Sequence, residues 1–169
     1  MATRRSTKTA AANGSADKNA PKLIQPNIGI DAAARGRVCE MLNVSLSNTV
    51  VLYFKTRHYH WNVTGMHFSQ LHELFEQQYD QLEEAIDEIA ERIRQIGGVP
   101  FATLDEYKRA ATLDEHPGVV PSAVQMVRNL LDDHETVIRA LRADADSADE
   151  LGDMGTNDFL VGLMQAHEK

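Results

Sequence analysis

The sequence lacks three features that would place the protein outside the cytoplasm. It has a single cysteine, Cys39, in 169 residues, which excludes an internal disulfide framework and is typical of a reducing compartment. Its longest uninterrupted apolar run, residues 50–54, is far too short to span a bilayer. No apolar segment follows the basic N-terminus as it would in a secretory signal. We therefore expect a cytoplasmic protein with no membrane partner.

The net charge of −8 is unevenly distributed along the chain. Residues 1–22 hold five basic residues against one acidic residue, Asp17, which gives this segment a charge of +4 and leaves −12 for the remainder. An acidic body favours cations over nucleic acid as ligands of the folded surface. The basic residues are Arg4, Arg5, Lys8, Lys18 and Lys22.

Residues 1–27 are rich in Ala, Ser, Thr, Asn and Lys and show no periodicity, which predicts a disordered basic tail. Two roles suit such a tail. It could bind DNA by counterion release, with its affinity raised by avidity where an assembly displays many tails, and the protein would then be associated with the nucleoid. Alternatively, it is a solvated extension without a specific partner.

Residues 28–169 follow helical patterns, and nothing alternates with the period of a strand. Asp31 is a suitable N-cap for a first helix, whose apolar residues recur every fourth position as Val38, Leu42, Leu46, Val50 and Phe54. Gly65 breaks the pattern, and a second helix is expected over residues 69–96. A short helix at 104–112, a third long helix from about residue 121 that fades within 143–155, and a last helix from 156 complete the chain. This order predicts an all-α four-helix bundle with a short extra helix between the second and third helices.

Five potential metal ligands lie within and just before the second helix: His60, His72, Glu76, Asp87 and Glu91. On an ideal helix the last four fall within an arc of about 100° and so share one face. Glu76 and Asp87 are nevertheless ~16 Å apart along the helix axis. One metal centre therefore cannot use both pairs from the same chain.

A second copy of the chain resolves this separation. If two copies of the second helix cross about a two-fold axis, His72 and Glu76 of one chain approach Asp87 and Glu91 of the other, and His60 joins the first pair. Di-iron bundles that complete their site within one chain use Glu-x-x-His pairs, and the sequence contains no such pair. Three carboxylates and two imidazoles without a thiolate favour ferrous iron over structural zinc. We expect a di-iron site between subunits, at which zinc could substitute.

The sequence resembles the Dps family, the DNA-binding proteins from starved cells, which are ferritin-like mini-ferritins. The resemblance covers residues 28–169, including the order of the helices. Its motif residues are His60-Trp61-Asn62, Gly65, Phe68, His72, Glu76, the block from Asp87 to Arg92, and Gly97-Gly98.

The resemblance implies a ferritin-like fold and an iron-oxidising function. Members of the family form hollow dodecamers, oxidise ferrous iron with hydrogen peroxide in preference to oxygen, and store the ferric mineral inside. By motif position, one subunit supplies His60, His72 and Glu76, and its two-fold mate supplies Asp87 and Glu91. The protein would then be a ferroxidase and an iron store that protects DNA from oxidative damage.

Four further residues are candidates for supporting roles. Trp61 lies beside the metal site in the family, where it intercepts radicals, although a core aromatic at the helix end is the simpler interpretation. Asp153 and Asp158 correspond to the region of the three-fold pore, or else are a solvated loop and a helix cap. His167 is a candidate extra metal ligand, because the last helix of a bundle can reach the same interface.

Two functions of different classes remain open from the sequence. The first is a ferroxidase and iron store. The alternative is a structural nucleoid-binding protein that uses the basic tail and retains a weak or vestigial metal site.

Overall fold

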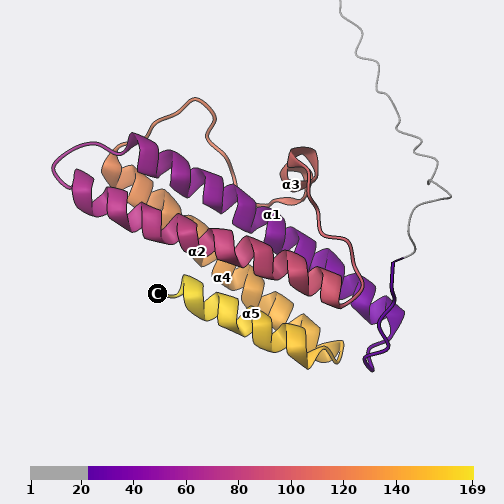
Figure 1. The fold of residues 1–169 in the computed structure, drawn as a ribbon. Coiled ribbons are helices and arrows are strands. Elements are labelled where there is room, and N and C mark those ends of the chain that lie inside the picture. The colour runs from indigo at the N-terminus through magenta and orange to yellow at the C-terminus, as the bar shows by residue number, and fades with distance from the viewer. Residues whose placement is uncertain (1–22) are drawn as a thin grey trace, which may run out of the picture.

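A computed structural model describes residues 23–169, and five helices follow one another along this part of the chain (Figure 1). They are α1 (Ala32–Asn62), α2 (Phe68–Gln95), α3 (Leu104–Ala110), α4 (Ala123–Glu150) and α5 (Met154–His167). Residues 23–169 contain no strand, so the prediction of an all-α bundle with a short helix between its second and third long helices is confirmed. None of the helices in this range is both long enough and apolar enough to cross a membrane. The basic residues proposed to bind DNA lie outside the described residues: Arg4, Arg5, Lys8, Lys18 and Lys22.

Local capping residues determine where α1 begins and where the chain turns after it. The Asp31 carboxylate accepts hydrogen bonds at 2.9 Å from the backbone N–H groups of Ala33 and Ala34, which otherwise have no helical acceptor. After α1 ends, Gly65 adopts a φ of 110°, a conformation that side chains with a Cβ disfavour. The N-cap at Asp31 and the break at Gly65 were both predicted from the sequence and are confirmed.

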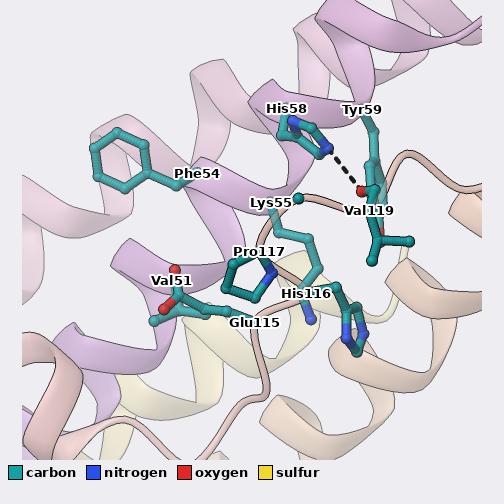
Figure 2. Close-up of a pocket in the computed structure, with 10 residues that line it drawn as sticks. Val51, Phe54, Lys55, His58, Tyr59, Glu115, His116, Pro117 and Val119 are labelled. Atoms are coloured by element: carbon teal, nitrogen blue, oxygen red, sulfur yellow. Dashed lines mark hydrogen bonds between the residues drawn. The ribbon is translucent and has the colours of Figure 1, made fainter.

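The link between α3 and α4 crosses the outer side of α1. His58 on α1 donates a hydrogen bond from Nε2 to the carbonyl of Val119 at 3.2 Å (Figure 2). A pocket of about 210 Å³ lies between this link and α1, and Lys55 and His116 are among the residues that line it. His58 therefore faces the link between helices.

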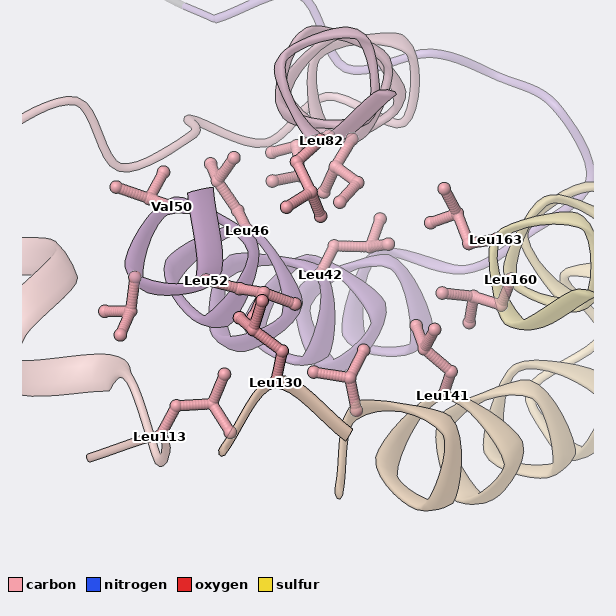
Figure 3. Close-up of a cluster of buried hydrophobic side chains, with 14 of the residues drawn as sticks. Leu42, Leu46, Val50, Leu52, Leu82, Leu113, Leu130, Leu141, Leu160 and Leu163 are labelled. Carbon is pink, nitrogen blue, oxygen red and sulfur yellow. The ribbon is translucent and has the colours of Figure 1, made fainter. Parts of the chain in front are cut away.

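The hydrophobic core lies where α1, α2, α4 and α5 meet. Leu42 and Leu46 of α1 are fully buried, and Figure 3 shows them among leucines from the other long helices. α1 packs mainly on α2, and α4 packs mainly on α5. Other fully or nearly fully buried core residues are Val38, Leu52, Tyr59, Phe75, Ile89, Ile93, Met126, Leu141 and Leu160.

One detail of the predicted helices is wrong. Phe54, the last member of the expected buried stripe, is 50% exposed, because steps of four residues overrun a helical turn by about 40° each and carry the stripe off the core side. The third long helix continues to Glu150 and so ends within residues 143–155, the range over which it was expected to fade. Ala145 and Ala148 are buried at its end, and their small side chains bring α4 close to α5.

Candidate metal centre

His60 and His72 meet where α1 ends and α2 begins. The Nδ1 atom of His60 lies 2.8 Å from the carbonyl oxygen of His72, and the Nδ1 atom of His72 lies 2.9 Å from the carbonyl oxygen of His60. The His60 carbonyl belongs to the last turn of α1, where carbonyls lack a helical donor. The two imidazoles thus connect the two helices reciprocally.

This pairing determines which ring nitrogens carry the hydrogens. A carbonyl oxygen only accepts hydrogen bonds, so each Nδ1 must donate. In the neutral imidazole, the Nε2 atoms of both His60 and His72 therefore carry a free lone pair. An imidazole held through Nδ1–H with Nε2 open is the usual arrangement of a metal-binding histidine.

Aromatic rings hold the two imidazoles in position. The rings of His60 and His72 stack with their centroids 3.6 Å apart at an interplanar angle of 22°. Phe68, one turn before His72 on α2, also stacks on the His72 ring, with the centroids 5.1 Å apart. Tyr79 meets His60 edge to face at 5.2 Å, and only 8% of His60 remains exposed. The pair is therefore preorganised in one chain.

Glu76 lies one helical turn beyond His72 and is exposed. The Tyr79 hydroxyl donates to its Oε1 atom at 3.4 Å. Desolvation raises the pKa of Tyr79, and the nearby Glu76 carboxylate raises it further, so the phenol stays protonated and can donate. The sequence prediction missed Tyr79, although its position three residues after Glu76 could have indicated the contact.

Asp87 and Glu91 form a second acidic pair further along α2. Both are exposed, and within residues 23–169 their carboxylates make no hydrogen bond or ion pair. Glu76 and Asp87 are eleven residues apart on one continuous helix, a rise of ~16 Å. No three His, Cys, Asp or Glu side chains in this range are arranged to hold a metal ion. One chain therefore presents a histidine-rich group and a separate carboxylate pair.

Trp61 is 65% exposed, so its interpretation as a core aromatic is wrong for the single chain. The guanidinium of Arg57 lies 5.7 Å from the Trp61 ring centroid and 4.9 Å from that of Tyr79. Tyr79 in turn contacts both His60 and Glu76. Arg57 thus connects Trp61 with the surroundings of the histidine pair, a contact that no sequence pattern indicated.

His167 does not lie beside His60 and His72. It contacts His134 of α4, and both line a pocket together with Gln78 of α2. Gln78 is two residues after Glu76, which turns it by about 200° on the helix. The structure therefore places His167 against the opposite face of α2 from Glu76.

The two candidate pore residues differ in their surroundings. Asp153 is 1% exposed and caps α5, accepting hydrogen bonds from the backbone N–H and the hydroxyl of Thr156. Its carboxylate also forms an ion pair with Arg92 at 2.8 Å. Asp158 lies exposed on α5. In the single chain Asp153 thus serves as a helix cap, one of the two roles considered for it.

Comparison with known proteins agrees with this fold. Residues 39–169 match the family model of the ferritin-like domain. A low temperature-induced protein of a Nostoc species is 49% identical over 144 residues, which cover 85% of this chain and 80% of that protein. A DNA protection during starvation protein of Brevibacillus brevis is 39% identical over 132 residues, which cover 78% of this chain and 88% of that protein.

A solved structure shows the same arrangement of helices. The Dps protein of Vibrio cholerae, described as a member of a broad superfamily of ferritin-like diiron-carboxylate proteins, gives a TM-score of 0.81 at 32% identity. The similarity covers 85% of this chain and 90% of that one. The chain thus has a ferritin-like domain. Within that class it belongs to the Dps family, and the resemblance seen in the sequence is confirmed.

Proposed function

We propose that the protein oxidises ferrous iron at sites shared by two copies of the chain and stores the ferric product. One copy supplies His60, His72 and Glu76, and the other supplies Asp87 and Glu91. The observation that supports this proposal most directly is the reciprocal bonding of His60 and His72, which leaves both Nε2 lone pairs free. Because a single chain keeps the histidine-rich group apart from the carboxylate pair, assembly becomes a condition of activity.

The ligand set suits the proposed reaction. Ferrous iron is the substrate, and its binding favours imidazole nitrogen together with carboxylate oxygen. Two ferrous ions reduce one hydrogen peroxide molecule to two water molecules, with the uptake of two protons and release of two ferric ions. Both electrons that cleave the peroxide bond come from iron, so no hydroxyl radical is left over. The carboxylates of Glu76, Asp87 and Glu91 stabilise the higher charge of the ferric product.

The negative charge of residues 23–169 and the proposed cage would serve the capture and storage of iron. The charge of −12 over residues 23–169 attracts ferrous ions to the surface. In the proposed assembly, a hollow dodecamer, ferric ions move inward and nucleate a mineral. Removal of both iron and peroxide protects DNA, which fits the name of the Brevibacillus brevis relative.

The decisive experiment tests whether two variants that are inactive alone restore activity when they assemble together. His60→Ala and Asp87→Ala chains each lose peroxide-dependent iron oxidation alone, measured by stopped-flow absorbance of the ferric product. When they are co-expressed and assembled in equal amounts, a shared site regains all its ligands wherever an intact His60 faces an intact Asp87. Random two-fold pairing gives about a quarter of the sites this composition, so about a quarter of the activity returns.

The control for complementation is His58→Ala, because His58 lies on α1 and faces the α3–α4 link. This variant keeps the parent rate, and sedimentation shows whether each variant assembles. Intact cages without recovered activity would contradict shared sites. Unchanged oxidation in the double variant His60→Ala/Asp87→Ala would instead favour a structural role.

The alternative function is binding of DNA through the basic residues at the N-terminus. The +4 charge of residues 1–22 supports it. Binding that depends on phosphate contacts weakens steeply with salt. A gel shift at low salt that is lost when residues 1–22 are deleted supports this function, whereas no shift of the full-length protein at low salt rejects it.

A further inference from the structure

His134 of α4 and His167 at the end of α5 form a second histidine pair. Their Nδ1 atoms lie 2.8 Å apart although the residues are 33 positions apart in the sequence. The ring centroids are 5.0 Å apart, and the rings are tilted by 55°. Both side chains are partly buried between α2, α4 and α5. The packing of three helices therefore brings two imidazole nitrogens together.

A contact between two Nδ1 atoms can use only one hydrogen. At least one of the two nitrogens must therefore present its lone pair to the other. Desolvation lowers the pKa of His134, and it lowers that of His167 to about 4, with the neighbouring His134 contributing. Both imidazoles are thus neutral near pH 7, which is the form that binds metal ions.

Two further polar atoms beside this pair lack a partner. The Nε2 atom of His134 and the Oε1 atom of Gln78 are buried and make no hydrogen bond within residues 23–169. Both residues line a small pocket of about 40 Å³, and both also line an adjoining, larger pocket of about 460 Å³. Buried polar atoms in folded proteins normally contact protein, water or an ion. The pair therefore lies beside pockets in which two buried polar atoms still lack a hydrogen-bond partner.

Two acidic side chains next to these histidines in the sequence are already paired. Asp133, next to His134, forms a buried ion pair with Lys55 at 2.7 Å. Glu168, next to His167, is bonded to Arg142 at 3.0 Å. The donor atoms that remain are imidazole nitrogen and amide oxygen, which favour divalent transition metals over magnesium or calcium.

We propose that His134 and His167 bind one divalent transition-metal ion through their Nδ1 atoms, with Gln78 and solvent beside it. On a tetrahedral zinc ion with Zn–N bonds of ~2.0–2.1 Å, the two nitrogens lie about 3.3 Å apart. The observed separation of 2.8 Å needs to widen by only about half an ångström. When the ion is bound, the Nε2–H group of His134 donates a hydrogen bond to the Gln78 carbonyl oxygen, either directly or through a bridging water. Metal-bound histidines commonly have such outer partners.

The bound ion would fasten the end of α5 to α4. This site is separate from the proposed iron site, because Gln78 and Glu76 lie on opposite faces of α2, about 200° apart. Its ligands are all from one chain. Neither proposal depends on the other.

The test uses the full chain carrying His60→Ala and Asp87→Ala, so that the proposed iron site does not compete for the probe. Zn²⁺ is titrated calorimetrically near pH 7 into protein freed of metal by chelation. We expect one strong zinc ion per chain, with a rise in Tm at excess zinc. Adding His134→Asn or His167→Asn weakens zinc binding by at least about tenfold and removes the rise.

The control is His116→Ala, which removes an exposed histidine on the α3–α4 link and leaves zinc binding unchanged. If the asparagine variants fail to assemble, a zinc-soaked crystal of the His60→Ala/Asp87→Ala protein shows by anomalous scattering whether zinc binds at this site. A peak between the two Nδ1 atoms supports the site, and its absence at saturating zinc overturns it. Peroxide-dependent iron oxidation by His167→Asn in the otherwise native chain stays at the native rate, whichever result the zinc experiment gives.

Discussion

His60 and His72 each donate a hydrogen bond from Nδ1 to the main-chain carbonyl of the other, at 2.8 and 2.9 Å. The two bonds join the C-terminal turn of α1 to the start of α2. They also fix both ring orientations and both tautomers. A structural role for Nδ1 and a ligand role for Nε2 therefore coexist in each ring and can be separated by mutation.

His60→Asn and His60→Ala separate these two roles. Both substitutions remove the ring contacts of His60 with His72 and Tyr79, but the asparagine amide can still donate to the His72 carbonyl. His60→Ala also loses this hydrogen bond, so we expect its free energy of unfolding to be about 1 kcal/mol lower than that of His60→Asn. Both variants lose Nε2, and we expect peroxide-dependent iron oxidation to fall at least about tenfold in each. Native oxidation rates in His60→Asn would show that Nε2 of His60 is not a ligand.

The parts of the fold that could be predicted from the sequence are those governed by local chemistry. The carboxylate of Asp31 bonds to groups two and three residues away, and the glycines at 65 and 97 adopt positive φ values of 110° and 90°. The regular spacing of His72, Glu76, Asp87 and Glu91 follows from the continuity of α2. Each of these features can be recognised from residues that are close to one another in the sequence.

The features that were missed depend on packing between helices. Trp61 looked apolar enough for the core, but the end of α1 turns it outward. His167 was considered as an extra ligand because the last helix of a bundle can reach the interface, and within the single chain the packing of α5 brings it to His134. Tyr79 reaches His60 only because α1 and α2 lie side by side. Contacts across such distances in the sequence leave no periodic signal within either helix.

Tyr79→Phe tests the orientation of Glu76. The substitution removes the hydroxyl that donates to Glu76 at 3.4 Å but keeps the aromatic contact with His60. Because this hydrogen bond is long, we expect a modest effect, a rise of about two- to threefold in the ferrous iron concentration needed for half-maximal oxidation, equivalent to about 0.5 kcal/mol. Tyr53→Phe, which alters the neighbouring ring on α1, is the control. Equal effects of the two substitutions would argue against a specific role for the Tyr79 hydroxyl.

Lys55 and Asp133 form a buried ion pair that links α1 to α4. Their side chains are 7% and 13% exposed, and the two charged atoms are 2.7 Å apart. Lys55→Met leaves the carboxylate buried without its partner, and we expect a loss of about 3–5 kcal/mol in the free energy of unfolding. The double variant Lys55→Met/Asp133→Leu removes both charges and recovers most of that loss. Urea unfolding at one fixed chain concentration measures both, and a single variant as stable as the native chain would refute the coupling.

Replacement by alanine should have opposite effects on stability at Gly98 and at Gly162. A Cβ atom at Gly98 would collide with Cys39 Sγ and lie 2.8 Å from Ile93 Cγ2, so we expect Gly98→Ala to cost about 1–3 kcal/mol. At Gly162, inside α5, a Cβ atom meets nothing within 4 Å. Gly162→Ala should therefore stabilise the protein by about 0.5–1 kcal/mol through helix propensity. Thermal unfolding of the two variants measures the difference, and a stabilising Gly98→Ala would show that Cys39 moves aside.

Asp144 provides a prediction about pH. Desolvation raises the pKa of its carboxyl group above the ordinary value, although a hydrogen bond from Ser45 at 3.4 Å partly opposes this. Between the unfolded and the folded pKa, the folded chain binds more protons than the unfolded chain. The stability contributed by this group is therefore fully present below the unfolded pKa and is lost as pH rises through the folded one.

Asp144→Asn should consequently stabilise the protein at pH 7, because the amide is neutral and still accepts the hydrogen bond from Ser45. The gain shrinks as pH falls below the folded pKa of Asp144, where the native carboxyl group is itself neutral. Urea unfolding of the native chain and Asp144→Asn at several pH values between 4 and 8 tests this. Asp146→Asn is the control, since Asp146 is exposed on the same helix and should show no such dependence. A stability difference for Asp144→Asn that stays constant across this range, or that grows toward acid pH, would show that burial does not disfavour the Asp144 charge.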